Sequence, residues 1–338
     1  MSADIIARVI RGNTVESIHR GHLLILDGAR NVIASAGDID TVVYYRSSAK
    51  AFQAIPLITS GAADAFGFTE AELALAAASH SGEAHHVEIA ASMLAKAGFT
   101  EADLRCGSHL PFSQPDAHRL IAAGETPSQI YNNCSGKHAA MLAFARHIGA
   151  DTADYDSPTN RIQKRILRCI AEFAEVSEES IAVGVDGCSA PNFALPLRSL
   201  AVSYLNLLDA SKFHEVTNAA AKRIVAAMLN HPELIGGTGR LDTRLMQAGH
   251  AKLISKVGAD GVWLCGVLPS ERWANGLAIA LKVEDGDDHK ARPVVAADIL
   301  RRLGVVDGVE LADMSPMAVK SRRGETVGQI STALDLQI

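Results

Sequence analysis

The chain has 338 residues, of which 48% are hydrophobic and only 5% aromatic, a length that allows one large domain or two ordinary ones. Its net charge of −6 argues against a general nucleic-acid-binding protein, because such proteins usually carry a basic face. There is no apolar run of roughly 18 residues and no secretory signal, and the five cysteines lack the spacing of a disulfide framework, so we expect a cytoplasmic protein with reduced thiols and no membrane or nucleic-acid partner.

Short aliphatic runs near the N-terminus predict strands at residues 5–10, 15–20, 22–27 and 31–36. Turns are predicted between them at Gly12-Asn13, Gly21 and Asp27-Gly28. The hydrophobic period then changes and predicts helices at residues 48–60, 70–78, 83–97, 139–148 and 211–230. Another helix is predicted to open at Ser157-Pro158, with the serine as cap and the proline at the first position.

Strand patterns return at residues 181–185, 252–257, 262–267 and 276–284, followed by a helix at 293–303 and a last strand at 328–336. Strands at both ends therefore flank a long helical middle. We expect an α/β (α+β) fold in one catalytic domain, residues 1–338, with a single sheet built from both termini. The sheet subdomain would span about 1–45 plus 250–338, and the helical insertion about 46–249. The glycine-rich run 236–240 lacks the strand and lysine of a phosphate loop, so we interpret it as a mobile loop, with contact to a ligand as the alternative.

Ser47 and Lys50 form an S-x-x-K pattern at the start of the first predicted helix. Residues i and i+3 share one helix face, so a neutral lysine amine there can take the proton of the serine hydroxyl. Lys256, in the strand-borne run Lys-Val-Gly, matches the third element of serine acyl enzymes of the β-lactamase and penicillin-binding type. The alternative for Lys256 is a surface lysine at a strand end.

Ser79, in the run Ser-His-Ser-Gly-Glu between two predicted helices, is a candidate for the middle element of that set. The alternative is that Ser79 or Ser81 caps the helix that starts near Glu83. His80, His85 and His86 also suggest a metal site, although adjacent histidines do not share a helix face.

Cys134 and Cys188 both fall at the ends of predicted elements, whereas Cys169 and Cys265 lie within a helix and a strand and are expected in the core. His138 is close to Cys134 in sequence. A catalytic cysteine with a histidine base, a metal site and two structural cysteines all remain open on spacing alone, and a disulfide is disfavoured in a reducing compartment.

Several segments together resemble the rhizobial, thermolabile type of L-asparaginase, the asparaginase II family, over nearly the whole chain. They are Arg46-Ser47-Ser-Ala-Lys50, Ser79-His-Ser-Gly-Glu83, Asn132-Asn-Cys134-Ser-Gly-Lys137-His138, Asp186-Gly-Cys188-Ser-Ala-Pro191 and Lys256-Val-Gly-Ala-Asp-Gly261. The combination is much more specific than any one of these motifs.

The resemblance implies a fold like that of serine β-lactamases and penicillin-binding proteins, a homodimer, and hydrolysis of L-asparagine to L-aspartate and ammonia. It also implies two Ser–Lys pairs, Ser47 with Lys50 and Ser79 with Lys256. One Zn²⁺ per chain is implied as well, supporting substrate affinity. The residues that match its ligands are Cys134, Lys137 and Cys188, with Asp186 beside them.

In the resulting hypothesis Ser47 attacks the side-chain amide, Lys50 accepts its proton, and Ser79 and Lys256 relay a proton to the departing ammonia. The residues predicted to bind substrate are Asp186 and Glu83 for the α-ammonium, Arg46 and His138 for the α-carboxylate, and His80. The alternatives are a hydrolase of β-lactams or peptides with the same Ser–Lys geometry, a zinc hydrolase in which metal-bound water attacks, and a non-enzymatic amino-acid-binding protein.

Overall fold

The computed structural model describes residues 2–336 and divides into two compact units. The first unit contains the residues up to 48, residues 195–205 and the residues from 244 onward. The second contains residues 49–194 and 206–243.

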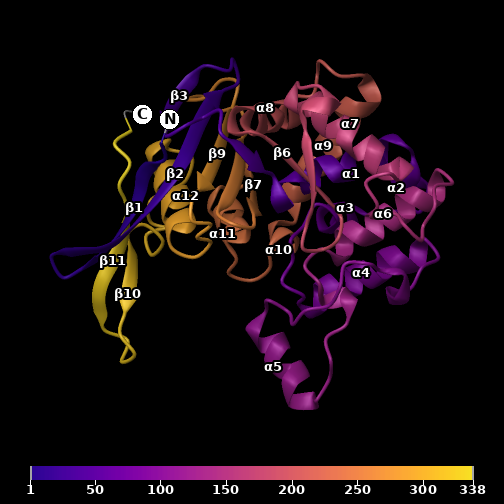
Figure 1. The fold of residues 1–338 in the computed structure, drawn as a ribbon, viewed down its shortest axis with the longest axis horizontal. Helices are drawn as coiled ribbons and strands as arrows, with labels where there is room; N and C mark the ends of the chain where they lie inside the picture. Colours follow the sequence, from indigo (N-terminus) through magenta and orange to yellow (C-terminus); the bar gives the residue numbers. More distant parts are fainter. Residues whose placement is uncertain (1, 337–338) are drawn as a thin grey trace. The chain divides into compact units, whose positions relative to one another are not determined.

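The first unit is built on an antiparallel sheet whose strands run in the order β10-β11-β1-β2-β9-β8-β7, with β3 also paired to β2 (Figure 1). Strand β2 joins the two ends of the chain in this sheet, because it pairs with β1 on one side and with β9 on the other. The prediction of one sheet built from both termini is therefore confirmed. The strands are β1 (Asp4–Arg11), β2 (Thr14–Asp27), β3 (Val32–Ala36), β7 (Leu253–Gly258), β8 (Val262–Val267), β9 (Leu277–Val283), β10 (Met317–Lys320) and β11 (Thr326–Thr332).

Gly21 is not a turn, which corrects one prediction. It lies inside β2, which runs unbroken through both of the predicted strands 15–20 and 22–27. A Cβ atom at Gly21 would lie 2.5 Å from the carbonyl oxygen of Lys282 on β9 and 2.6 Å from the side chain of Ile6. The glycine therefore allows the close approach of neighbouring strands rather than a change of chain direction.

Helix α12 (Ala291–Arg302) packs against β1, β8, β9 and β11. Its residues from Ala291 to Leu300 are all buried. At its C-terminal end the buried Asp298 is paired with Arg301 and Arg302, so its charge is compensated within the helix. The helix covers one face of the sheet, where it contacts β8, a strand that is apolar and buried along its whole length.

The second unit is helical, and α1 (Lys50–Thr59) lies at its centre, in contact with α6, α7 and α9. Two strands of this unit, β5 (Ala182–Val185) and β6 (Pro191–Pro196), form an antiparallel pair. The helices are α2 (Ala62–Ala65), α3 (Glu70–Ala76), α4 (Ala84–Lys96), α5 (Gln114–Ala123), α6 (Ser135–His147), α7 (Arg161–Ala174), α9 (Glu215–Asn230) and α10 (Pro232–Ile235). The chain also forms β4 (Val42–Tyr44), the 3₁₀ helix η1 (Arg46–Ala49), α8 (Leu197–Leu208) and α11 (Leu241–Ala248).

Two helices begin later than the sequence predicts. Helix α7 starts at Arg161, where the side chain of Asn160 accepts a hydrogen bond from the Ile162 N–H at 3.0 Å. This asparagine satisfies an otherwise unpaired helix donor, so it and not Ser157 is the cap. Helix α9 starts at Glu215, directly after its N-cap residue His214.

No helix within residues 2–336 is long and apolar enough to cross a membrane.

Candidate active site

Ser47 lies in η1, and this 3₁₀ helix runs directly into α1, which begins at Lys50. Ser47 is half-buried, and the residue before it, Arg46, has a φ of +52°, in the left-handed region that residues with a Cβ rarely adopt. The Arg46 guanidinium forms an ion pair with Asp260 in the turn after β7. This strained position is held in place by its neighbours, as is common where a side chain is presented for chemistry.

The turn that carries Ser47 is anchored by two buried tyrosines of the first unit. The Tyr45 hydroxyl donates to the Ser203 hydroxyl at 2.5 Å, and the Tyr204 hydroxyl donates to the Ser48 carbonyl at 3.0 Å. The Ser48 hydroxyl in turn donates to the Tyr45 carbonyl at 2.6 Å. The Ser48 hydroxyl therefore bonds the local backbone, while Ser47 is only half-buried.

Lys256 approaches the same turn from β7. A Cβ atom at Gly258 would lie 2.6 Å from the Tyr45 carbonyl oxygen and 3.0 Å from the Arg46 Cβ, so the end of β7 touches the residues just before Ser47. Side chains at i and i+2 of a strand point to the same face, which places the fully buried Lys256 on the face of β7 that meets this turn. The first unit thus brings Ser47 and Lys256 to one region.

Lys50 is almost fully buried at the start of α1, and its ammonium is surrounded by three oxygens of the second unit. It donates to the Ala78 carbonyl, to the Ser79 hydroxyl at 2.9 Å and to the Asn133 carbonyl at 3.2 Å. Three acceptors satisfy the three N–H bonds of the charged form. A neutral amine keeps two N–H bonds for the two carbonyls and turns its lone pair toward the Ser79 hydroxyl, so the geometry suits proton exchange between these two side chains.

The structure therefore pairs Lys50 with Ser79, whereas the resemblance pairs Lys50 with Ser47. The two arrangements are compatible, because an amine next to one hydroxyl can pass a proton between two. The pairing of Ser47 with Lys50 stays a prediction.

The segment from Ser79 to Glu83 is extended and bonded on both sides. The Ser79 N–H donates to the Ile235 carbonyl at 2.9 Å, and the Ser81 hydroxyl donates to the Gly236 carbonyl at 2.8 Å. Neither serine caps α4, which corrects that alternative: the cap is Glu83, whose backbone N–H donates to Nδ1 of His86 at 3.1 Å. Ser79 is thus left to bond Lys50.

His80 is completely buried, and both of its ring nitrogens form hydrogen bonds that fix this segment. Its Nδ1 accepts from the Gly82 N–H at 3.1 Å, so its Nε2 carries the proton and donates to the Ser135 hydroxyl at 2.9 Å. Burial, and then the nearby His86, lower its pKa well below the usual range, which keeps the ring neutral. Its contact with substrate stays a prediction.

Glu83 accepts two hydrogen bonds from Thr238, one from the backbone N–H at 2.7 Å and one from the hydroxyl at 3.0 Å. The glycine-rich run 236–240 is therefore bonded to the Ser79–Glu83 segment at its Thr238. A carboxylate has about four acceptor positions, so Glu83 retains capacity for a further donor such as an α-ammonium.

Cys134, Lys137 and Cys188 lie together, and each is at least 95% buried, at 3%, 3% and 4% exposure. The Lys137 ammonium donates to Cys188 Sγ at 2.9 Å. A hydrogen bond from the Cys134 thiol, together with the charge on Lys137, lowers the pKa of Cys188 far below its usual range, so Cys188 is the thiolate of this group. The bond to Cys188, and then burial, raise the pKa of Cys134 well above its usual value.

This donor set fits zinc, which favours thiolate sulfur and nitrogen. Next to it, the buried ring of His138 interacts with Cys188 and helps to lower the pKa of that thiol, while its Nδ1 bonds the Tyr155 hydroxyl at 2.8 Å. Burial lowers the pKa of His138, so the ring is neutral and can act as a ligand or acceptor. Asp186 lies close enough to Lys137 to raise its pKa, though less than Cys188 does.

A second group of possible metal ligands is formed by Glu83, His85 and His86, whose ligand atoms lie within 4.8 Å of one another. His86 is not available to an ion there, because its Nδ1 accepts from the Glu83 N–H and its Nε2 bonds the Glu233 carbonyl at 3.2 Å. Both ring nitrogens of His80 are also bonded. The histidine trio does not offer a set of free ligands.

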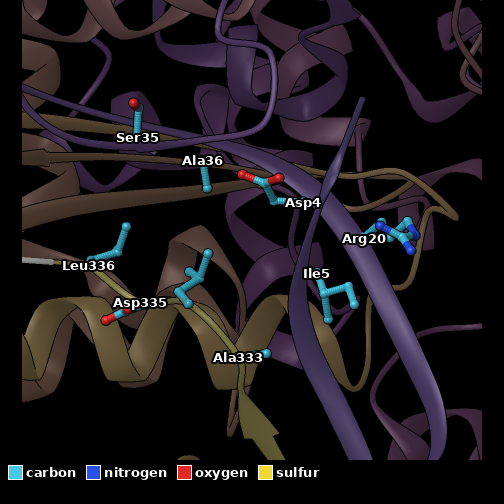
Figure 2. Close-up of a pocket in the computed structure, with 9 residues that line it drawn as sticks. Asp4, Ile5, Arg20, Ser35, Ala36, Ala333, Asp335 and Leu336 are labelled. Atoms are coloured by element: carbon cyan, nitrogen blue, oxygen red, sulfur yellow. The ribbon is translucent and has the colours of Figure 1, made fainter. Parts of the chain in front are cut away.

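A pocket of about 420 Å³ opens in the first unit beside β1 and the C-terminal segment (Figure 2). Its lining residues are Asp4, Ile5, Arg20, Ser35, Ala36, Ala333, Leu334, Asp335 and Leu336. None of the predicted site residues belongs to it. Its Asp4 accepts from the Gly37 N–H at 2.7 Å and its Arg20 donates to the Ala3 carbonyl at 3.2 Å, so these two charged groups bond the neighbouring backbone.

The sequence analysis missed residues that the fold brings to the site from distant segments. The Asn133 carbonyl accepts a hydrogen bond from the Lys50 ammonium, and the Thr238 N–H donates one to the Glu83 carboxylate. Asn133 was visible inside the motif around Cys134, but nothing in its spacing indicated a bond to a lysine some eighty positions earlier.

The family model described as L-asparaginase II matches residues 7–332. No curated protein matches the chain.

Three solved structures illustrate the structural similarity. A probable glutaminase from Bacillus subtilis, complexed with 6-diazo-5-oxo-L-norleucine, is 13% identical, covers 85% of this chain and 84% of its own, and has a TM-score of 0.39. A mutant of the class A β-lactamase of the last common ancestor of Gram-negative bacteria is 16% identical, with coverage of 85% and 92% and a TM-score of 0.41. A β-lactamase from Burkholderia ambifaria is 13% identical, with coverage of 85% and 94% and a TM-score of 0.39.

Proposed function

Because the chain belongs to the L-asparaginase II family, and is on that ground an amidohydrolase, we propose that it hydrolyses L-asparagine to L-aspartate and ammonia through a Ser–Lys acyl-enzyme. The observation that carries the mechanism is the buried ammonium of Lys50 bonded to the Ser79 hydroxyl at 2.9 Å. A buried amine whose other two partners are carbonyls has one position left for exchanging a proton, and a serine occupies it.

In the proposed reaction Ser47 Oγ forms a bond to the side-chain amide carbon of asparagine, and its proton passes to the neutral amine of Lys50. The tetrahedral intermediate collapses when the C–N bond breaks, and the leaving nitrogen takes a proton through Ser79 and Lys256. Ammonia departs and leaves an ester on Ser47. Water then attacks that ester, the same amines receive and return its proton, and L-aspartate is released.

The local backbone supports this assignment. Ser47 lies at the start of a helical run, and the first N–H groups of a helix have no partner within it, so those not bonded elsewhere can bind the oxyanion. The Ser48 N–H is not among them, because it donates to the Tyr45 carbonyl at 3.2 Å. Removal of one such donor typically costs about 3–4 kcal/mol of transition-state stabilisation. Lys256 is buried on the face of β7 that meets the Ser47 turn, which suits a role in the relay.

For substrate binding, Glu83 and Asp186 are the proposed partners of the α-ammonium, since both are acidic and lie beside the site segments. Of the two residues first predicted for the α-carboxylate, Arg46 is paired with Asp260, and His138 is a buried neutral ring. His80 contributes by fixing the backbone from Ser79 to Gly82.

We also propose one Zn²⁺ per chain, held by Cys134, Lys137 and Cys188. When bound, the ion supplies a fixed positive charge that orders the two sulfur-bearing loops and strengthens substrate affinity. Lys137 must lose its proton to bind a metal, and the thiolate of Cys188 must exchange its ammonium partner for the ion.

The family membership also supports a cytoplasmic homodimer. Strand β5 is a candidate contact surface, because within residues 2–336 its one strand partner is β6 and it exposes Val183 and Val185 at 43% and 72%. Light scattering on the purified protein should give twice the chain mass of 35.7 kDa. A monomeric mass at micromolar concentration would contradict the dimer.

The deciding experiment is ammonia release from L-asparagine and L-glutamine, with a chromogenic β-lactam assayed in parallel. We expect turnover of asparagine, loss of that turnover in Ser47→Ala, and no β-lactam hydrolysis. Full turnover by Ser47→Ala would exclude the serine mechanism. Hydrolysis of the β-lactam without ammonia release would instead identify a β-lactam-directed acyl hydrolase.

A further inference from the structure

Arg240, in the second unit, is a cation without an acidic partner. Its guanidinium carbon lies 5.0 Å from the ring centroid of Phe112, and within residues 2–336 no carboxylate lies at ion-pair distance from it. Other arginines of the same unit do have such partners: Arg105 pairs with Asp156, Arg168 with Glu178 and Arg223 with Asp64. Arg240 is only partly exposed, so water does not fully replace a missing anion.

The position of Arg240 is fixed by the contacts of the preceding residues with the Ser79–Glu83 segment. The Ile235 carbonyl accepts from Ser79, and Thr238 donates twice to Glu83. Gly237 has a φ of +108°, and a Cβ there would lie 2.6 Å from the Ser81 hydroxyl, so a glycine is required for this close approach. The two segments therefore run side by side and end with Glu83 and Arg240 near each other.

Phe112, whose ring contacts the Arg240 guanidinium, is also connected to the Ser79–Glu83 segment. The next residue, Ser113, donates its N–H to the Ser81 carbonyl at 3.0 Å. The Phe112 ring stacks on the ring of His109, with 4.8 Å between the centroids. His109 Nε2 accepts from the N–H of Asn133 at 3.2 Å, and the carbonyl of Asn133 is one of the three acceptors of Lys50. A chain of contacts thus joins Arg240 to the residues around the catalytic amine.

The region therefore presents one anion and one cation that are close in space but not paired with each other. Thr238, which bonds Glu83, is two residues before Arg240, so the Cα atoms of Thr238 and Arg240 are at most about 7.6 Å apart. The α-carbon of an amino acid carries an ammonium and a carboxylate, and this zwitterion matches such a pair of groups. A guanidinium binds a carboxylate through two parallel N–H bonds.

We propose that Arg240 binds the α-carboxylate of the amino-acid substrate, while Phe112 holds the guanidinium in place and Glu83 faces the α-ammonium. This inference rests on the proposed function and names the residue that selects amino acids over simple amides. Arg46 is not needed for this role, because Asp260 already compensates its charge.

The test compares Arg240→Gln with the wild type on L-asparagine, and uses β-alaninamide, which is asparagine without its α-carboxylate, as a competitive inhibitor. Loss of a bidentate charged contact should raise KM for asparagine about 10- to 100-fold, since each tenfold corresponds to about 1.4 kcal/mol. We expect kcat to change less than about threefold and the inhibition constant of β-alaninamide to stay the same. Arg240→Lys should recover part of the affinity, and Phe112→Ala should raise KM for asparagine but not alter the constant for β-alaninamide.

The matched control is Arg165→Gln, because the guanidinium of Arg165 also lies over an aromatic ring, Phe144 at 6.0 Å, in the same unit. It should behave as the wild type in every assay. An unchanged KM for asparagine in Arg240→Gln would overturn the proposal, as would an equal loss of affinity for β-alaninamide.

Calorimetric binding of L-aspartate provides the same comparison without turnover. Weaker aspartate binding by Arg240→Gln supports the assignment even if the wild type releases no ammonia, a result that would refute the proposed reaction alone. Equal aspartate binding by the two proteins overturns the assignment of Arg240 whatever the activity.

Discussion

Replacement of Ser79 by alanine tests the role of the Lys50–Ser79 contact most closely. The variant removes one of the three acceptors of a buried ammonium and leaves the carbonyls of Ala78 and Asn133. An unsatisfied buried donor costs about 1–3 kcal/mol, so we expect the free energy of unfolding to fall by about that amount. We expect kcat for asparagine to fall about 10²- to 10⁴-fold, the usual contribution of a positioned proton-transfer group. The two quantities are measured by urea unfolding and by ammonia release.

Ser92→Ala is the control for the structural part of this effect. The Ser92 hydroxyl donates to the carboxylate of Glu72 at 2.8 Å, so it too bonds a charged side chain, but it lies on α4 outside the site. It should lose comparable stability and keep kcat within about twofold. The reasoning is refuted if Ser79→Ala retains a tenth or more of the wild-type kcat, or if Ser92→Ala loses activity to the same extent.

Four further outcomes are expected. Lys256→Met should leave a folded protein, because the site is fully buried and methionine fills a similar volume, but lower kcat at least about 100-fold in the ammonia assay. Burial alone would raise the pKa of Glu72, but bonds from Lys96 and the Thr69 backbone outweigh it and hold that pKa below its ordinary value of 4.5. Its ionised form therefore adds stability above about pH 4.5, and this stability is lost as the pH falls through the folded-state pKa. In urea unfolding, the difference in the free energy of unfolding between the wild type and Glu72→Gln should therefore shrink over that range. A constant difference would contradict the assignment. Removal of zinc by prolonged chelation should raise KM for asparagine and change kcat less than about threefold, whereas abolished turnover would favour attack by metal-bound water. Gly21→Ala should lower the thermal unfolding midpoint by several degrees through the clash with Lys282, and an unchanged midpoint would count against the close strand approach.

Much of the sheet could be predicted because its strands are short aliphatic runs bounded by turn residues. The predicted strand 262–267 coincides with β8, and the segments that form β1, β3 and β9 were predicted as strands, although their pairing with β2 was not. The exception is Gly21, which has the composition of a turn but lies inside β2. Only the tertiary approach of Lys282 explains it, and a contact between residues so far apart in sequence leaves no local pattern.

The motifs of the candidate site are readable in the sequence, but the contacts between their residues are not. Ser47, Lys50, Ser79 and Lys256 stand in recognisable local patterns, because each sits near the end of an element. The partner that Lys50 bonds was not readable, since the choice between Ser47 and Ser79 depends on how α1 packs against the segment after α3. Ligand contact by the run 236–240 was an open alternative, but the contact of Arg240 with Phe112 was not readable from the sequence, because Phe112 belongs to a distant part of the chain.

The most direct test of the central claim is to identify the side chain that becomes acylated. The protein is incubated with a diazoketone analogue of asparagine, and the labelled peptide is sequenced by mass spectrometry, with Ser47→Ala as the control. The account predicts one covalent adduct per chain on Ser47 and none in the control. An adduct on Ser79 or on a cysteine, or equal labelling of the Ser47→Ala variant, would contradict it.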